Sequence, residues 1–125
     1  MYDKKLVLNS LLNIQKALAL ISERMENIHQ VDDFLRSPNG MVLLDAICMN
    51  LIALGETTKG LDKITKGTLW AFYPEINWQG IMRMRDKIAH HYFDVDAEVV
   101  FNTIKEDIPL VIPVINRMIA DLEET

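Results

Sequence analysis

The segment MRDKIAHHYFDVD, from Met84 to Asp96, concentrates more chemically reactive side chains than any other stretch of the chain. An arginine, two adjacent histidines, a tyrosine and three aspartates lie within it. Because an imidazole titrates near neutral pH, either histidine could donate or accept a proton during a reaction. The arginine can bind an anionic group through two parallel hydrogen bonds. The segment is therefore either a site for acid–base chemistry or the charged end of a helix.

Helical geometry separates the two strongest candidates, Arg85 and His90. At about 100° per residue, Tyr92 lies almost on the face of Arg85, whereas His90 lies roughly 140° away from it. If Arg85 and His90 act together, either the helix is distorted near Ala89 or the groups converge across an interface between two subunits. Asp86 lies four residues before His90 and shares its face, so its carboxylate could hold the imidazole in one tautomer.

Each reactive side chain also has a purely structural interpretation. Arg85 could be a solvated or ion-paired arginine, and His90 could be a helix-end histidine stabilised by the helix dipole. His91 falls on the predicted apolar face of the helix, which favours a packed core position. Tyr92 could cover the core and leave its hydroxyl in water. For any one of these residues taken alone, spacing favours the structural interpretation.

The whole chain has the composition of a single globular domain, spanning residues 1–125. Half of its 125 residues are apolar and a quarter are charged, which is enough for a core and argues against disorder. The net charge of −5 argues against a generally basic surface for nucleic acid, so any such contact must be local or built by combining subunits. The single cysteine, Cys48, excludes an internal disulfide and indicates a reducing, cytoplasmic setting. No stretch approaches the ~20 apolar residues of a membrane span, and the N-terminal segment is expected to be an amphipathic helix and not a signal peptide.

Apolar residues with helical spacing predict an all-α fold. Alternating steps of four and three residues predict a first helix of about 25 residues, carried by Val7, Leu11, Ile14, Leu18, Ile21, Met25 and Ile28. A short helical turn is expected at residues 34–35, before a turn cluster at 37–40. A second helix is expected over residues 41–59, with Gly60 as its stop.

Beyond an irregular middle region, two further helices are expected. Trp78 begins the helix that carries the reactive segment. Asp96 is a good N-cap for the last helix, and Pro109 should split or bend that helix close to Asp107. Together these elements predict an up-and-down bundle of four to five helices.

Arg85, His90 and Tyr92 form an Arg-x4-His-x-Tyr arrangement at the end of the helix that begins at Trp78. This arrangement resembles the signature of the HEPN superfamily and is most similar to the HepT-like toxins. The segments YPEINW, EVVFNTIKEDIPL and NLIALGETTKGL also resemble that family. The likeness therefore covers most of the chain, and it is weakest in the first helix.

The resemblance implies a homodimeric, metal-independent endoribonuclease that acts as the toxin of a type VII-like toxin–antitoxin pair. The two motifs of such a dimer line one cleft, which agrees with the angular separation of Arg85 from His90. The implied antitoxin is a minimal nucleotidyltransferase, which neutralises the toxin by transferring AMP to the motif tyrosine, here Tyr92. RNA is the implied substrate, and the resemblance implies no cofactor and no membrane partner.

The resemblance also implies a role for each residue of the motif. His90 would take a proton from the ribose 2′-hydroxyl or give one to the leaving 5′-oxygen. Arg85 would bind the scissile phosphate and stabilise the charge of the transition state, and Asp86 is assigned the orientation of His90. Tyr92 would contact the RNA and accept AMP, which adds bulk and negative charge to a cleft meant for phosphate.

Further charged residues surround the motif in the sequence. Arg83 and Lys87 add local positive charge and are candidate RNA contacts. Glu56 is expected to pair with an arginine of the helix that begins at Trp78, as a structural contact between helices. The lysines of the irregular middle region could extend the positive patch, although a solvated loop is the simpler interpretation: Lys59, Lys63 and Lys66.

Two other functions compete with a ribonuclease. The chain could be a non-catalytic HEPN subunit that binds substrate or partner beside a nucleotidyltransferase, although an intact Arg85 and His90 argue against this. It could also be a helical dimerisation module whose charged segment seals an interface. Three histidines and one cysteine do not make a zinc-binding set, so no metal site is expected.

Overall fold

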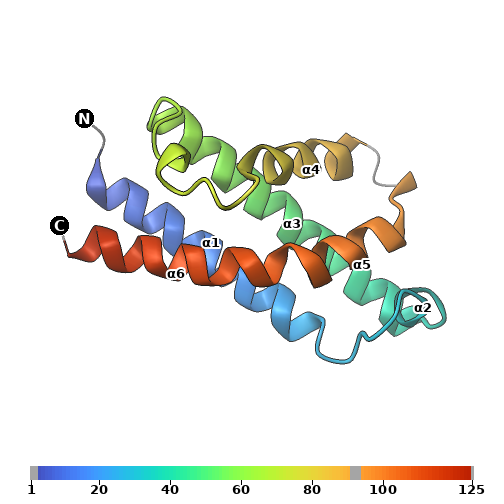
Figure 1. Ribbon diagram of the computed structural model, residues 1–125. Coiled ribbons are helices and arrows are strands. Elements are labelled where there is room, and N and C mark those ends of the chain that lie inside the picture. The colour runs from blue at the N-terminus through green and yellow to red at the C-terminus, as the bar shows by residue number, and fades with distance from the viewer. Residues whose placement is uncertain (1–2, 91–93, 125) are drawn as a thin grey trace.

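The computed structural model describes residues 3–90 and 94–124. Within these ranges the chain contains helices, turns and loops but no strand, which confirms the predicted all-α bundle. The described part forms six α-helices and one 3-10 helix (Figure 1): α1 (Lys4–Arg24), α2 (Asp32–Leu35), α3 (Pro38–Ile64), η1 (Trp70–Phe72), α4 (Trp78–His90), α5 (Ala97–Glu106) and α6 (Ile108–Glu123). There are more helices than the predicted four to five because α2 is a separate turn and the last helix divides at Asp107.

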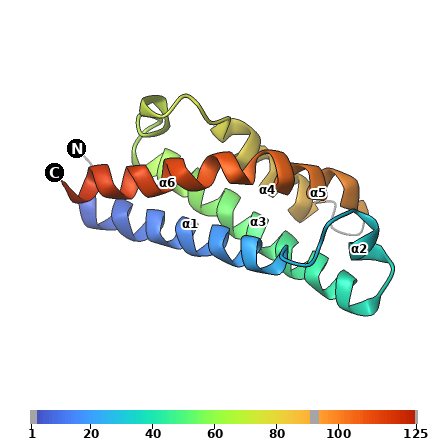
Figure 2. The ribbon, with the colours of Figure 1, turned by 60° about the horizontal axis from the view of Figure 1, so that its bottom comes forward.

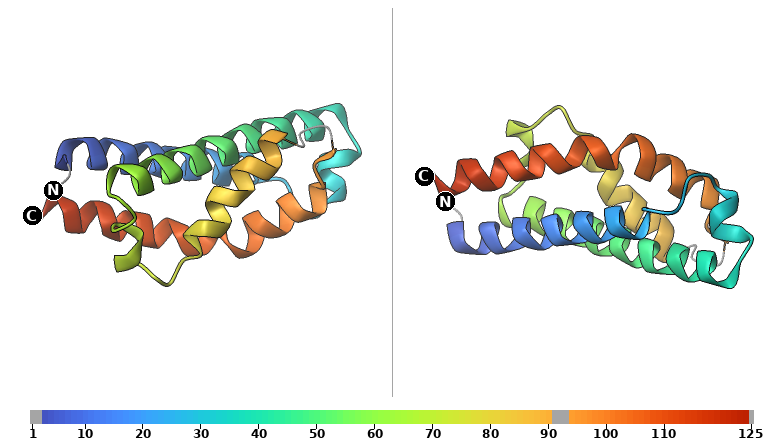
Figure 3. Two further views of the ribbon diagram at one scale, coloured as in Figure 1. Left: turned by 90° about the horizontal axis from the view of Figure 1, so that it is seen from above. Right: turned by 90° about the horizontal axis from the view of Figure 1, so that it is seen from below.

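The long helices run up and down beside one another. α1 packs between α3 and α6, and the start of α1 lies beside the end of α6 at one end of the bundle (Figures 1 and 2). α3 is central, because α1, α2 and α4 all contact it. Figure 3 shows α4 lying obliquely between α3 and the arm formed by α5 and α6.

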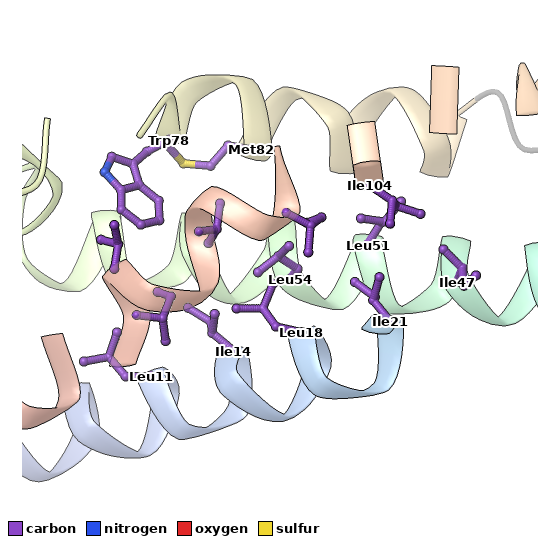
Figure 4. Close-up of a cluster of buried hydrophobic side chains, with 14 of the residues drawn as sticks. Leu11, Ile14, Leu18, Ile21, Ile47, Leu51, Leu54, Trp78, Met82 and Ile104 are labelled. Atoms are coloured by element: carbon purple, nitrogen blue, oxygen red, sulfur yellow. The ribbon is translucent and has the colours of Figure 1, made fainter. Parts of the chain in front are cut away.

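The apolar stripe of α1 forms one wall of the core. All seven residues of the predicted stripe are buried, although α1 itself ends at Arg24 and the last two lie beyond it. Figure 4 shows Ile14 and Leu18 beside Leu54 of α3, with Trp78 and Met82 of α4 on the opposite side of the cluster. Burying each such side chain contributes about 1.5–3 kcal/mol of favourable transfer free energy.

The start of α3 follows from a proline and a capping serine. Ser37 is the N-cap, and its hydroxyl accepts a hydrogen bond from the backbone N–H of Gly40 at 3.0 Å. Pro38 occupies the first helical position, where its missing N–H costs no internal hydrogen bond. α3 therefore begins three residues earlier than the sequence predicted.

The predicted stop of α3 at Gly60 is wrong, because the helix continues to Ile64. Leu61 is 1% exposed, so the extra turn adds to the core. Lys66 and Gly67, which follow the last turn of the helix, have φ angles of 54° and 76°. The N–H of Gly67 donates to the carbonyl of Asp62 at 2.8 Å, which closes a Schellman cap.

By length and composition α3 could cross a membrane, with a mean hydropathy of 1.5 over its most apolar 18-residue window. The expectation that no segment reaches this criterion is therefore wrong for α3. Core helices of soluble proteins meet the same criterion, and α3 has three helices packed against it.

Three other predicted boundaries are confirmed. α4 begins at Trp78, whose ring stacks on Trp70 with centroids 4.0 Å apart. Asp96 caps α5 by accepting a hydrogen bond from the N–H of Glu98 at 2.9 Å. The break between α5 and α6 falls at Asp107, immediately before a helix with proline in its first turn.

Cys48 lies in α3 and points into the core, where it is 2% exposed. Burial is the main cause that raises the pKa of its thiol to about 11, and the carboxylate of Asp45 adds to the effect. The thiol therefore stays protonated and apolar at neutral pH.

Candidate active site at the contact between α3 and α4

Arg85 reaches from α4 to α3 and binds two carboxylates. Its Nη2 donates to Oε1 of Glu56 at 2.7 Å, and its Nη1 donates to Oδ1 of Asp86 at 2.9 Å. The predicted pairing of Glu56 with an arginine of this helix is confirmed. The hydrogen bonds to Glu56 and then Asp86 raise the pKa of Arg85, so its guanidinium remains a cation.

A glycine allows the two helices to approach closely enough for this contact. Gly55 is buried in α3, and a Cβ atom added there would lie 2.3 Å from the Cβ of Arg85. Any larger residue would have to push α4 away from α3, because neither Cβ is on a flexible chain end. Gly55 therefore sets the separation across which Arg85 meets Glu56.

Asp86 extends the network back to α3. Its Oδ2 accepts a hydrogen bond from Nζ of Lys59 at 3.4 Å, while its Oδ1 accepts from Arg85. The hydrogen bond from Arg85 is the largest cause that lowers the pKa of Asp86, and the charge of Lys59 adds to it. Two cations and two carboxylates thus alternate across the helix contact: Glu56, Arg85, Asp86 and Lys59.

The guanidinium of Arg85 has donors that no described residue uses. Its side chain is 26% exposed, and its buried Nε has no hydrogen-bond partner among the described residues. A guanidinium carries two N–H bonds on each terminal nitrogen. The contacts of each terminal nitrogen that the structure describes use one of them. Arg85 can therefore still bind an anion while both carboxylates hold it.

His90 is the last residue of α4, and it is exposed. α4 stays α-helical through Ala89 and His90, so a helix distortion there does not bring His90 to Arg85. The orientation of His90 by Asp86 stays a prediction, because the contacts described for both oxygens of Asp86 involve Arg85 and Lys59.

The remaining predicted site residues fall into two groups. Arg83 and Lys87 are exposed on α4, where solvent and ligands can reach them. Tyr92 and His91 lie outside the described residues.

The lysines assigned to an irregular region have a more defined setting than the sequence suggested. Lys59 and Lys63 both belong to α3, and Lys63 does so because the helix runs past Gly60. Lys66 occupies the left-handed position of the cap that ends α3. The ion pair of Lys59 with Asp86 was missed, because it forms only where α3 and α4 pack together.

Two cavities flank α4 away from the ion-pair network. One, of about 280 Å³, lies between α4 and the α5–α6 arm, and its wall includes Ile81, Met84 and Ile108. A second, of about 80 Å³, includes Met84 and Lys87. Neither lining includes Arg85 or His90 among the described residues. No group of three or more histidine, cysteine, aspartate or glutamate side chains in the described ranges is arranged to hold a metal ion.

Comparison with known proteins identifies relatives along most of the chain. The family model "Ribonuclease HepT-like" matches residues 14–118. A protein of Thermococcus cleftensis named "Probable ribonuclease HepT" is 37% identical over 97 residues, which cover 78% of this chain and 81% of that protein. A protein of Methanocaldococcus jannaschii named "Putative RNase" is 30% identical over 113 residues, covering 84% of this chain and 88% of the relative.

No solved structure matches the chain closely enough to be significant. The family match nevertheless includes both helices of the ion-pair network, with Glu56 and Arg85 well inside its limits. The breadth of this match and the similarity of the relatives agree with the motif in α4: the chain belongs to the HepT-like family of ribonucleases.

Proposed function

We propose that this ribonuclease is a metal-independent endonuclease in which Arg85 binds the scissile phosphate and His90 transfers a proton. The observation that carries the proposal is the state of Arg85, a partly buried cation whose terminal nitrogens each keep an N–H that no described residue uses. Such a group can bind a phosphate bidentately and stabilise the extra charge of a phosphorane-like transition state. His90, exposed at the end of the same helix, is free to exchange protons with an RNA substrate.

The proposed active unit is a homodimer in which the two motifs share one cleft. Helical geometry supports this arrangement, because Arg85 and His90 lie roughly 140° apart on a regular helix. A symmetric dimer would bring His90 of one copy toward Arg85 of the other. It would also double the local positive charge from Arg83 and Lys87 on a chain whose net charge is −5.

Cleavage of RNA by the purified protein in excess EDTA tests the chemistry. The wild type should cut, and both Arg85→Ala and His90→Ala should reduce the rate by about 100-fold or more, as expected when a transition-state donor or a general base is removed. Equal rates for all three proteins would refute the assignment. Tight RNA or partner binding without cleavage by any of them would favour the non-catalytic HEPN subunit instead.

We further propose that the protein is a toxin of the type VII-like class, neutralised by a minimal nucleotidyltransferase that adds AMP to Tyr92. An adenylyl group there would bring a phosphate and a base into a cleft that must accept RNA. Intact-mass measurement after incubation with the partner enzyme and ATP should show an added AMP in the wild type and none in Tyr92→Phe.

Tyr73 supplies a matched control for that experiment. Its hydroxyl hydrogen-bonds to Oδ2 of Asp121 at 3.0 Å, away from the motif. Tyr73→Phe should therefore be labelled as fully as the wild type. Undiminished labelling of Tyr92→Phe would show that another residue accepts AMP.

A further inference from the structure

We infer that Glu56 is a positioning residue for the ribonuclease reaction and acts through Arg85. This inference rests on the proposed role of Arg85 in binding the scissile phosphate. Sequence alone assigned Glu56 only a structural contact between helices. The geometry of the contact points to a more specific role, because Glu56 fixes the guanidinium on a helix other than the one that carries it.

Glu56 is the most direct restraint on the end of the Arg85 side chain. The Oε1–Nη2 distance is 2.7 Å, within the range of a strong charge-assisted hydrogen bond. Nε of Arg85 is buried without a partner among the described residues. The terminal nitrogens therefore supply all of its described anchoring, one through Glu56 and one through Asp86. Without Glu56, one of these two anchors is lost.

The backbone of Glu56 lies well within a long α-helix, whose hydrogen bonds fix its position. The residue lies inside the 27-residue α3, next to Gly55, where an added Cβ would meet the Cβ of Arg85 at 2.3 Å. About one helical turn later in α3, Lys59 forms an ion pair with Asp86, which is the other carboxylate of the network. Glu56 thus holds the guanidinium of Arg85 in a defined position relative to α3. A restraint of this kind lowers the reorganisation needed when charge builds up on the phosphate.

The negative charge of Glu56 should weaken RNA binding, even though the residue positions Arg85 for the reaction. A carboxylate whose side chain is 56% exposed repels an approaching phosphate. Removing its charge should therefore leave KM unchanged or lower it, while the loss of alignment lowers kcat. A residue that merely joins two helices would not separate kcat from KM in this direction.

The test compares Glu56→Gln with Glu75→Gln. Glu75 pairs with Arg117 at the same distance of 2.7 Å, but it lies away from the α3–α4 contact. With an RNA substrate in EDTA, Glu56→Gln should lower kcat between about 10- and 100-fold without raising KM. Glu75→Gln should leave both constants within about twofold, as expected for an exposed ion pair. Thermal melting should be nearly the same for both variants.

A double substitution tests whether Glu56 acts through Arg85. Arg85→Lys keeps the positive charge but cannot bind two groups in a planar fork. Adding Glu56→Gln to Arg85→Lys should therefore change kcat by less than about twofold.

Three results would overturn the inference while the proposed function stands. These are an unchanged kcat in Glu56→Gln, a raised kcat/KM in Glu56→Gln, or a full additional loss in the double variant. If the wild type does not cut RNA, or if Arg85→Ala cuts as fast as the wild type, the proposed function itself fails, and the inference with it.

Discussion

Two arginine–glutamate pairs of equal length lie in different parts of the molecule. Arg85 meets Glu56 between α3 and α4, and Arg117 of α6 meets Glu75, each at 2.7 Å. Arg117 is 51% exposed and lies over the ring of Tyr73, 5.4 Å from its centroid. Arg85 is 26% exposed, binds a second carboxylate and has a buried Nε.

The difference shows that distance alone does not indicate what an ion pair does. An exposed pair gains little free energy, because water and salt screen it and two long side chains lose their freedom. The pair at Arg85 sits where two helices nearly touch, so its geometry is imposed by the backbone. We therefore expect substitutions at the two pairs to differ most in activity, next in stability, and least in their response to acid.

The largest difference is expected when each arginine is replaced by lysine. Arg85→Lys should reduce RNA cleavage about 100-fold or more, because an ammonium cannot hold two carboxylates and still present a fork to phosphate. Arg117→Lys should cut RNA at nearly the wild-type rate. Parallel initial-rate assays in EDTA measure both variants. Equal losses would show that the two pairs are equivalent.

A smaller effect, on the free energy of unfolding, is expected from substituting Gly55, which lies beside the Arg85–Glu56 pair. Gly55→Ala forces a Cβ to within 2.3 Å of the Cβ of Arg85, so the free energy of unfolding should fall by about 1–3 kcal/mol. Gly60→Ala in the same helix meets nothing within 4 Å, so it should raise that free energy by about 0.5–1 kcal/mol. Urea denaturation of the two variants measures the contrast. A stabilised Gly55→Ala would mean that the helices are free to separate.

The smallest effect concerns acid. Hydrogen bonds from Arg85 and Arg117 lower the pKa values of Asp86 and Glu75, respectively. A lowered pKa in the folded state means that folding stabilises the carboxylate form. The contribution of each carboxylate to the free energy of unfolding is therefore full above the ordinary carboxyl pKa of about 4. It is lost as the pH falls through the lowered values.

Asp86→Asn and Glu75→Gln should therefore both melt with a weaker dependence on pH than the wild type between about pH 5 and pH 2. The change should be slight in each case, since both carboxylates are exposed. Melting temperatures across that range provide the measurement. A steeper dependence in either variant would contradict the sign of the shift.

The sequence predicted best those features that local chemistry decides. The stripe of α1, the cap at Asp96 and the break at Asp107 each follow from residues within one or two helical turns, and all three are confirmed. The stop at Gly60 failed because glycine weakens a helix only slightly, whereas Leu61 gains a buried position. The helix stops only ahead of Lys66 and Gly67, where the backbone adopts positive φ angles.

The candidate site was predictable as a set of residues but not as a network. The motif identified Arg85 and His90, and charge alone suggested a partner for Glu56. The closeness of α3 and α4 at Gly55 depends on tertiary packing, which no local pattern encodes. For the same reason the ion pair of Asp86 with Lys59 was missed, and Asp86 was assigned to His90 on the basis of helical spacing.

The burial of Cys48 has a practical consequence for testing the proposed dimer. Its thiol is shielded in α3 and its pKa is raised to about 11, so maleimide reagents at neutral pH should leave it unmodified. A single cysteine introduced at Leu110, which is 60% exposed, would then carry the only fluorophore on each chain without removal of the natural thiol. Mixing donor- and acceptor-labelled chains would report subunit pairing directly by energy transfer, with the core left intact.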